Sequence, residues 1–489
     1  TANGVTTVQN MAGQPFHLAL RKRTANGEVL GPRIITAGPT TAQVGVETPE
    51  AAERVVAEQK ALGYDMIKMY GGRNGIMTPE TYHRLVTTAH AAGMRVVGHA
   101  ARNLPFQTVL QEKQNSIDHM EEVLYTERSF DRLLKAYVDV QFDRAAPGVR
   151  DSLARIPVPD FGAELKPEIA AFAASAKKAG IAITPNIVFF RNIGWMGSDS
   201  IFELMRAPEL AYATPGQRLN WSPMLNNYRN GWGDNLALMT AYFAQATRLA
   251  EAITRALNDA GVPVMTGTDS EYLGAQPGFG LHTELEIFQH LGMTPIDALK
   301  AATLTPARVM QISDSVGTVE KGKIADLVLL NADPTKDVKN TREIAGVFTA
   351  GRWMPRAPLD SRLDSLTKSY APLQRELARF VDALEKNGAA AALDVYRASA
   401  QRTTIAKTVE RVINSYGYRL LGEKKTAEAL ATFKLNTEAF PAEYNTWDSL
   451  AEAYMNSGER DLAIKYYQKV LELHPGDQNA TEMLRRLGR

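Results

Sequence analysis

Four side chains of the types that bind metal ions or carry protons lie at the ends of short apolar runs. Lys68 lies in MIKM, His99 follows VVG, His119 follows SID, and Asp269 follows MTGT. The spacings are 31 residues from Lys68 to His99 and 20 residues from His99 to His119, about one strand and helix each. A single histidine at a strand end is more often structural. Four such residues at successive strand ends favour a shared metal or catalytic site at one rim.

The runs that carry these residues belong to a repeated pattern of strand and helix. Amphipathic stretches such as PEAAERVVAEQKALG separate the runs, and each ends in a glycine that is typical of a helix terminus. Alternating strands and helices predict a parallel sheet, and seven runs favour an α/β (β/α)8 barrel that lacks one strand, over residues 1–310. Residues 191–240 are expected to form a loop over the barrel mouth. The seven runs are GVTTVQNMAG, PRIITAG, YDMIKMYGG, MRVVGHA, NSIDHME, IAITPNIVF and VPVMTGTDS.

The pattern changes after residue 310. Residues 311–358 are predicted to form short strands of a small β domain, the C-terminal part of a β-sandwich. Residues 359–400 are predicted to form a helical linker. Residues 401–489 are predicted to form an all-α module of tetratricopeptide repeats, which suggests a protein partner. Deletion of residues 400–489 is expected to leave the barrel chemistry intact while altering solubility or partner binding, because repeat units contact mainly their neighbours. The repeat has a period of 34 residues, which relates Ala429, Phe433 and Pro441 to Ala463, Tyr467 and Pro475.

Composition excludes several classes of partner and metal ligand. With 55 basic and 54 acidic residues, the chain has no strong field to attract nucleic acid or an acidic membrane. No apolar run approaches the roughly 18 residues of a membrane span. Because the chain has no cysteine, a transition metal would be held by histidine and carboxylate groups. These features predict a folded, soluble protein for which nucleic acid and membranes are disfavoured as partners.

The runs together resemble the amidohydrolase superfamily, and within it the imidazolonepropionase- and dipeptidase-like branch. The resemblance covers residues 1 to about 355 and includes VVGHA, SIDHME, TGTDS, LHTELEIF and VGTVEKGKIADLVLLNADP. It implies that Lys68 reacts with carbon dioxide to form a carbamate that bridges two divalent metal ions. It also implies that His99 and His119 bind the second metal and that Asp269 binds the first metal and carries protons. Zinc suits these ligands, and manganese or cobalt would also be accepted.

One motif of that family is absent from the chain. The family's first barrel strand ends in an H-x-H pair of metal ligands, and none of the eight histidines forms such a pair. GVTTV then corresponds to the second strand of the family. We favour a truncated sequence over a true loss of the first strand, because an opened barrel would expose two unpaired strand edges.

The resemblance implies a hydrolase in which a metal-bridging hydroxide cleaves a C–N amide bond. The substrate would be a dipeptide, an N-acyl amino acid or a cyclic amide. Two alternatives stay open: a mononuclear deaminase-like enzyme, which Lys68 argues against, and an inactive barrel that serves as a repeat-bearing scaffold, which the missing H-x-H supports. The repeat sequence GYRLLGEKKTAEALATF resembles modules of exported bacterial hydrolases, so we expect a periplasmic or secreted protein.

His282 and Glu284, in GLHTELEIF, could be mistaken for an H-x-E pair of metal ligands. They fall where a barrel helix is expected to begin. Helix capping or support of the site is therefore favoured over contact with substrate.

Overall fold

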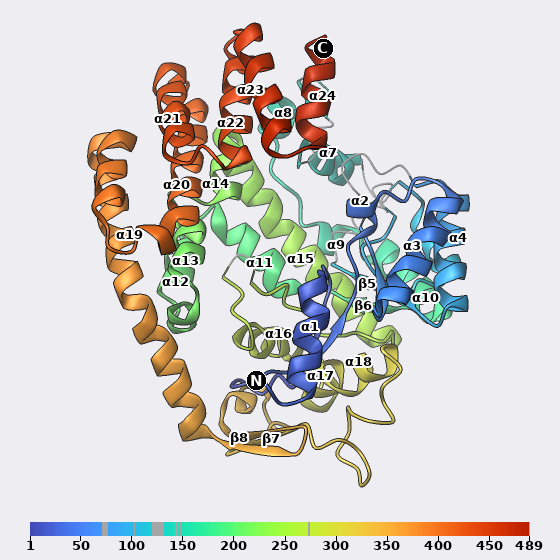
Figure 1. Cartoon of the computed structure of the whole chain (residues 1–489). Coiled ribbons are helices and arrows are strands. Elements are labelled where there is room, and N and C mark those ends of the chain that lie inside the picture. The colour runs from blue at the N-terminus through green and yellow to red at the C-terminus, as the bar shows by residue number, and fades with distance from the viewer. Residues whose placement is uncertain are drawn as a thin grey trace. The chain divides into compact units, whose positions relative to one another are not determined.

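The chain divides into two compact units in the computed structural model. The first unit comprises Thr1–Gly194 and Leu238–Arg362, and the second comprises Trp195–Ala237 and Leu363–Arg489 (Figure 1). Within the part of the chain that the structure describes, every helix falls short of the length or apolarity that a membrane span requires. The described residues are 1–70, 77–101, 103–119, 132–141, 145–146, 148–271 and 274–488.

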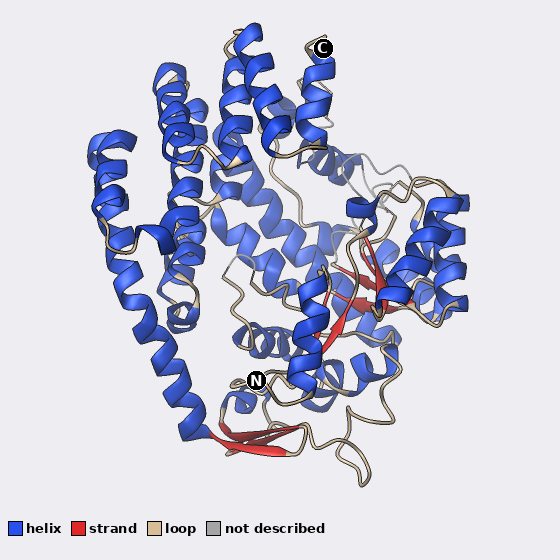
Figure 2. Ribbon diagram, viewed as in Figure 1, coloured by secondary structure: helices blue, strands red, loops and turns tan. Residues whose placement is uncertain are grey.

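Short parallel strands form the framework of the first unit (Figure 2). The strands are β1 (Thr7–Asn10), β2 (Arg33–Thr36), β3 (Met66–Met69), β4 (Arg95–Gly98), β5 (Ser116–Asp118) and β6 (Ala182–Thr184). Parallel pairing joins β1 to β2, β3 to β4 and β5 to β6.

Further backbone contacts join these pairs to one another and to the last predicted run. Ala37 bridges Met66, the Asn115 N–H donates to the Val96 carbonyl at 2.9 Å, and Ile183 bridges Val264. All seven predicted runs therefore lie side by side in chain order. Closure of this arrangement into a barrel stays a prediction.

Helices connect the strands of the first unit, and their ends have clear local causes. In α3 and α4, the Thr48 and Thr78 hydroxyls accept the N–H groups of Ala51 and Thr81, and a proline follows each threonine. The two helices pack side by side (Figure 1). The helices are α1 (Pro15–Ala25), α2 (Thr41–Val44), α3 (Pro49–Leu62), α4 (Pro79–Ala91), α5 (Phe106–Glu112), α7 (Arg132–Gln141), α8 (Val149–Leu153), α9 (Phe161–Glu164), α10 (Lys166–Ala179), α11 (Ile187–Met196), α15 (Leu236–Ala260), α16 (Phe279–His290), α17 (Pro295–Ala302) and α18 (Leu304–Val309).

The predicted small β domain is a three-stranded antiparallel sheet at the end of the first unit. Its order is β7 (Leu327–Leu330), β8 (Ile344–Thr349) and β9 (Arg352–Pro355), with the short helix η4 (Val338–Arg342) before β8. Ala350 and Gly351 both have positive φ in the two-residue turn between β8 and β9. This conformation matches the twist of a tight hairpin.

The second unit is helical and is built from two separate stretches of chain. The inserted stretch carries α12 (Ser200–Arg206), η2 (Pro208–Tyr212), α13 (Pro215–Trp221), α14 (Asn227–Trp232) and η3 (Gly233–Asn235). The C-terminal stretch carries α19 (Arg356–Ala398), whose residues up to Arg362 belong to the first unit, and α20 (Arg402–Gly422), α21 (Thr426–Ala439), α22 (Tyr444–Asn456), α23 (Arg460–Leu473) and α24 (Gln478–Arg486). A non-helical residue, Gly388, kinks α19.

The inserted stretch packs against C-terminal helices. Leu219, Met224 and Leu225 join an apolar cluster with side chains of α19 and α20, such as Phe380 and Val409. Residues 195–237 thus belong to the helical unit, whereas the sequence predicts a loop over the barrel mouth. The difference arises because apolar side chains of the inserted stretch pack against partners more than 150 residues later in the chain. The predicted helical linker, residues 359–400, likewise contributes buried side chains such as Phe380 to this cluster.

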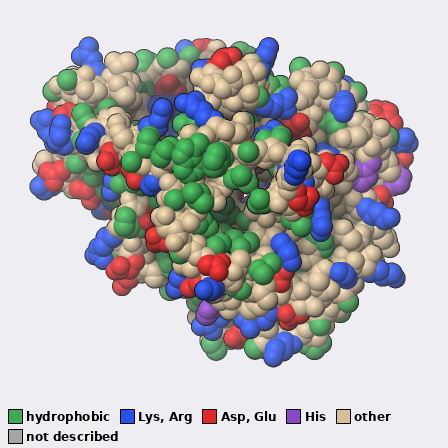
Figure 3. Space-filling view, turned by 90° about the horizontal axis from the view of Figure 1, so that it is seen from below, with side chains coloured by type: hydrophobic (Ala, Val, Ile, Leu, Met, Phe, Trp, Pro, Cys, Tyr) green, Lys and Arg blue, Asp and Glu red, His purple; other side chains and the backbone are tan. Residues whose placement is uncertain are grey.

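The 34-residue period of the C-terminal stretch corresponds to successive helix pairs. Ala429 and Phe433 are fully buried, and a Cβ atom on Gly417 would lie 2.6 Å from the Phe433 ring. Glycine at this position therefore allows α20 and α21 to approach closely. In the next pair, Ala451 and Tyr467 occupy the equivalent buried positions. Across the face drawn in Figure 3, basic and acidic side chains are interspersed, in keeping with their near-equal numbers.

Candidate functional site

Lys68 forms a buried ion pair at the carboxyl end of the parallel strands. Lys68 is 5% exposed, and its Nζ lies 3.4 Å from Oδ2 of Asp118, the last residue of β5. Asp118 is also buried, so the carboxylate balances a charge that would be costly to bury alone. Asp118 was not among the predicted site residues. The available signal was an acidic residue in the apolar run SID, directly before His119.

His99 and His119 lie next to each other at the ends of β4 and β5. Both are buried, and their ring centroids are 4.8 Å apart with 32° between the ring planes. Tyr70 places its ring edge-to-face against His99 at 4.5 Å, and Phe189 lies 5.8 Å from the His119 ring. The two imidazoles are therefore the middle members of a row of four rings.

The backbone of His119 is held in an uncommon conformation. Its φ is 71°, in the left-handed region that residues other than glycine rarely adopt. The His119 N–H donates to the Thr184 carbonyl at 2.8 Å and to Oδ1 of Asn186 at 3.2 Å. These bonds link the ends of β5 and β6.

Glu284 and His282 have structural partners, as the sequence predicts. Glu284 is fully buried and accepts the N–H groups of Ile187 and Val188 at 3.0 and 2.9 Å. It caps α11 rather than its own helix. Burial raises the pKa of Glu284 to about 7, although the two amide hydrogen bonds oppose the shift. Burial lowers the pKa of His282 to about 4, and its Nδ1 lies 2.8 Å from the Thr341 hydroxyl.

Asp269 shares the electrostatic surroundings of the Lys68–Asp118 pair. Burial of its carboxyl group raises the pKa of Asp269, the positive charge of Lys68 lowers it, and the negative charge of Asp118 raises it. The residue as a whole is exposed, and its φ is 48°. Asp269 therefore lies within the electrostatic reach of the pair, at the end of the seventh run.

The four predicted residues are thus brought together in part. Lys68 contacts Asp118, and His99 contacts His119, while the charges of Lys68 and Asp118 act on the carboxyl group of Asp269. Among the residues that the structure describes, no three histidine, aspartate or glutamate side chains converge closely enough to hold a metal ion. Imidazole and carboxylate groups are donors that zinc accepts, and Lys68 would join them only as a carbamate. The two glycines that end the YDMIKMYGG run and the last two residues of the NSIDHME run lie outside the described residues.

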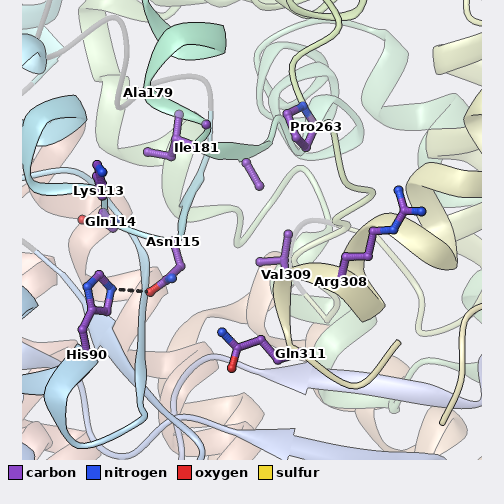
Figure 4. Close-up of a pocket in the computed structure, with 12 residues that line it drawn as sticks. His90, Lys113, Gln114, Asn115, Ala179, Ile181, Pro263, Arg308, Val309 and Gln311 are labelled. Carbon is purple, nitrogen blue, oxygen red and sulfur yellow. Dashed lines mark hydrogen bonds between the residues drawn. The ribbon is translucent and has the colours of Figure 1, made fainter. Parts of the chain in front are cut away.

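A separate cavity of about 360 Å³ lies at the opposite, amino end of the strands (Figure 4). It is lined by residues that precede strands, including Asn115 and Ile181, and His90 hydrogen-bonds Asn115 at 3.0 Å. Lys113 and Arg308 line it from the C-terminal ends of α5 and α18. Basic groups at helix C-termini are favoured by the helix dipole. Their presence is thus explained without a ligand.

Residues 2–354 match the amidohydrolase family, and residues 446–481 match a tetratricopeptide repeat. An imidazolonepropionase of Geobacillus kaustophilus (strain HTA426) is 42% identical over 93 residues, which are 19% of this chain and 21% of that protein. An imidazolonepropionase of Geobacillus thermodenitrificans (strain NG80-2) is 40% identical over 94 residues, 19% of this chain and 21% of that protein. The chain thus spans about a fifth of the length of these curated relatives.

A solved structure of a bottromycin amidohydrolase resembles the chain with a TM-score of 0.52 and 23% sequence identity. The match covers 76% of this chain and 75% of that chain. At this level of identity the likeness shows a shared fold.

Proposed function

Because the chain belongs to the amidohydrolase family, we propose that it is a metal-dependent hydrolase that cleaves a C–N amide bond. The observation that carries the proposal is the adjacent His99 and His119 rings beside the Lys68–Asp118 pair at the strand ends. The proposed substrates are dipeptides, N-acyl amino acids and cyclic amides.

Four residues would hold the metal ions in this proposal. His99 and His119 would supply neutral imidazole nitrogens, Asp269 a carboxylate, and Lys68 a carbamate formed with carbon dioxide. Two divalent ions, zinc or else manganese or cobalt, would polarise the substrate carbonyl and acidify water when bound. Formation of the carbamate would convert the cation that now faces Asp118 into an anion, so Asp118 would have to find another partner or a proton.

The chain's own groups would orient the substrate and move the proton. Asp269 would take a proton from water and deliver it to the leaving nitrogen, because it lies at the strand end close to the charges of Lys68 and Asp118. Tyr70 is 40% exposed and packs edge-to-face with His99, so its ring offers a surface for an apolar part of the substrate. Phe189 is buried against His119 and would keep water from that side of the imidazole.

The test is Lys68→Ala, with Lys60→Ala as a matched control because Lys60 is exposed on α3. Metal content of the purified proteins and turnover of dipeptides, N-acyl amino acids and lactams would be measured. We expect Lys68→Ala to lose metal and to lose more activity than the roughly 10–100-fold that removal of a residue supporting a metal ligand costs. Added acetate should restore a little activity. Two metals per chain with near-normal turnover in Lys68→Ala would refute the assignment.

We also propose that the helical unit binds a protein partner, because residues 446–481 match a tetratricopeptide repeat. Location in the periplasm or outside the cell is part of the same proposal. Affinity capture with the full chain, compared with a chain altered on the exposed faces of α22 and α23, would test the partner.

A further inference from the structure

The carboxylate of Glu284 is placed at the N-terminus of a helix that is distant in sequence. Oε1 and Oε2 accept the N–H groups of Ile187 and Val188, the first two residues of α11, which lie 97 and 96 positions away. The first N–H groups of a helix have no partner within the helix, and a negative charge there is favoured by the helix dipole. Glu284 therefore fixes the position of the first turn of α11.

The residue before this turn is bonded directly to His119. Asn186 is buried, has a φ of 53°, and accepts the His119 N–H through its side-chain Oδ1. Asparagine adopts the left-handed conformation more readily than most residues, but the conformation remains uncommon outside glycine, so contacts from neighbouring residues favour it. The bonds from Glu284 to the next two residues supply this support.

The same helical turn also contacts the ring of His119. Phe189, the third residue of α11, lies 5.8 Å from the His119 ring, and that ring also contacts His99 at 4.8 Å. A shift of the first turn of α11 would therefore move both the backbone contact and the ring contact of His119.

We propose that Glu284 is a positioning residue for His119, acting through Asn186 and Phe189 at the start of α11. The proposal rests on the proposed function, in which His119 is a metal ligand. If Glu284 had a purely structural role, its replacement would lower the stability of the first unit without a particular effect on His119.

The test compares Glu284→Ala and Glu284→Gln with His282→Gln. His282 is buried on the same helix, but its hydrogen bonds go to Thr341 and to the Asn3 carbonyl rather than to α11, so its variant is a matched control. Histidine ring resonances would be recorded by NMR on metal-free full-length protein with labelled histidine. The His119 signal among the eight histidines would be assigned with His119→Gln.

We expect Glu284→Ala to shift the His119 ring resonance and to speed exchange of its amide hydrogen, and Glu284→Gln, which keeps one acceptor oxygen, to shift it less. His282→Gln should leave both signals unchanged. Zinc affinity should fall by roughly 10–100-fold in Glu284→Ala and stay unchanged in the control.

Unchanged His119 signals in either folded Glu284 variant would overturn the proposal. If Glu284→Ala does not fold, Glu284→Gln alone decides. Because the NMR measurement needs no metal, it separates this proposal from the proposed function. A wild-type chain that binds none of zinc, manganese and cobalt would contradict the proposed function, whereas the NMR shifts would still decide the role of Glu284.

Discussion

Replacement of Leu225 by alanine tests whether the inserted stretch and the C-terminal helices form one cooperative unit. Leu225 lies in residues 195–237, which the sequence predicts to be part of a loop over the barrel mouth. Its side chain is nevertheless buried, with 2% of the residue exposed. Its cluster includes Phe380 and Leu384 of α19 and Val409 of α20. A cavity at Leu225 should therefore weaken helices that are far away in sequence.

The expected loss follows from the burial of this side chain. Leucine-to-alanine changes in protein cores cost about 2–5 kcal/mol, and the cost rises with the volume of the cavity that remains. Several neighbours of Leu225, such as Leu219 and Met224, are only partly buried and can relax into the space. We therefore expect about 3 kcal/mol, in the lower half of the range.

Hydrogen exchange measured by mass spectrometry can locate this loss. Peptides from α19 and α20 should exchange roughly a hundredfold faster, because each 1.36 kcal/mol corresponds to about a tenfold change. Peptides from β3 and β4 should exchange as in the wild type. Phe202→Ala is the control, since Phe202 lies on α12 in the same insert but is 45% exposed.

An increase in exchange rate confined to the inserted stretch, or one of equal size in β3 and β4, would refute the reasoning.

The packing of the insert against α20 also affects what happens when the C-terminal helices are removed. Removal of residues 400–489 was expected to leave the barrel chemistry intact, but it would also uncover apolar side chains of the insert that pack against α20. We expect such a truncated chain to aggregate unless the insert is shortened as well.

Two further predictions concern buried charges of the first unit. Asp118→Ala should lower the free energy of unfolding by about 3–5 kcal/mol in urea denaturation, because Lys68 loses its buried partner, and Lys68→Met in the same chain should restore part of it; no loss in Asp118→Ala would contradict the pair. Burial raises the pKa of Glu284 from 4.5 to about 7, so the folded state holds a proton that the unfolded state releases in this interval. Stability should therefore fall as pH rises from 4.5 to about 7 and not above, and Glu284→Gln should lack this part of the slope in urea midpoints. Equal slopes in both proteins would contradict the assignment.

Local sequence patterns were sufficient to predict the elements that carry the candidate site. The seven runs were recognisable because strand and helix periodicity depend on neighbouring residues, and the structure shows all seven side by side. Phe433 was placed in a repeat by a spacing of 34 residues, and it does pack within the helical unit, close to Gly417. Strand-end positions also predicted that Lys68 and His99 lie near the same rim.

Tertiary structure alone decided which partners these residues meet. The carboxylate of Asp118 lies 50 positions from Lys68, and Glu284 lies 97 positions from the amide that it caps. The packing of Leu225 with Phe380 likewise joins segments that no local pattern relates. A buried charge, a free helix N-terminus and an apolar side chain each require a partner, but the sequence states only the requirement. Which residue meets it depends on where the folded chain brings distant segments together.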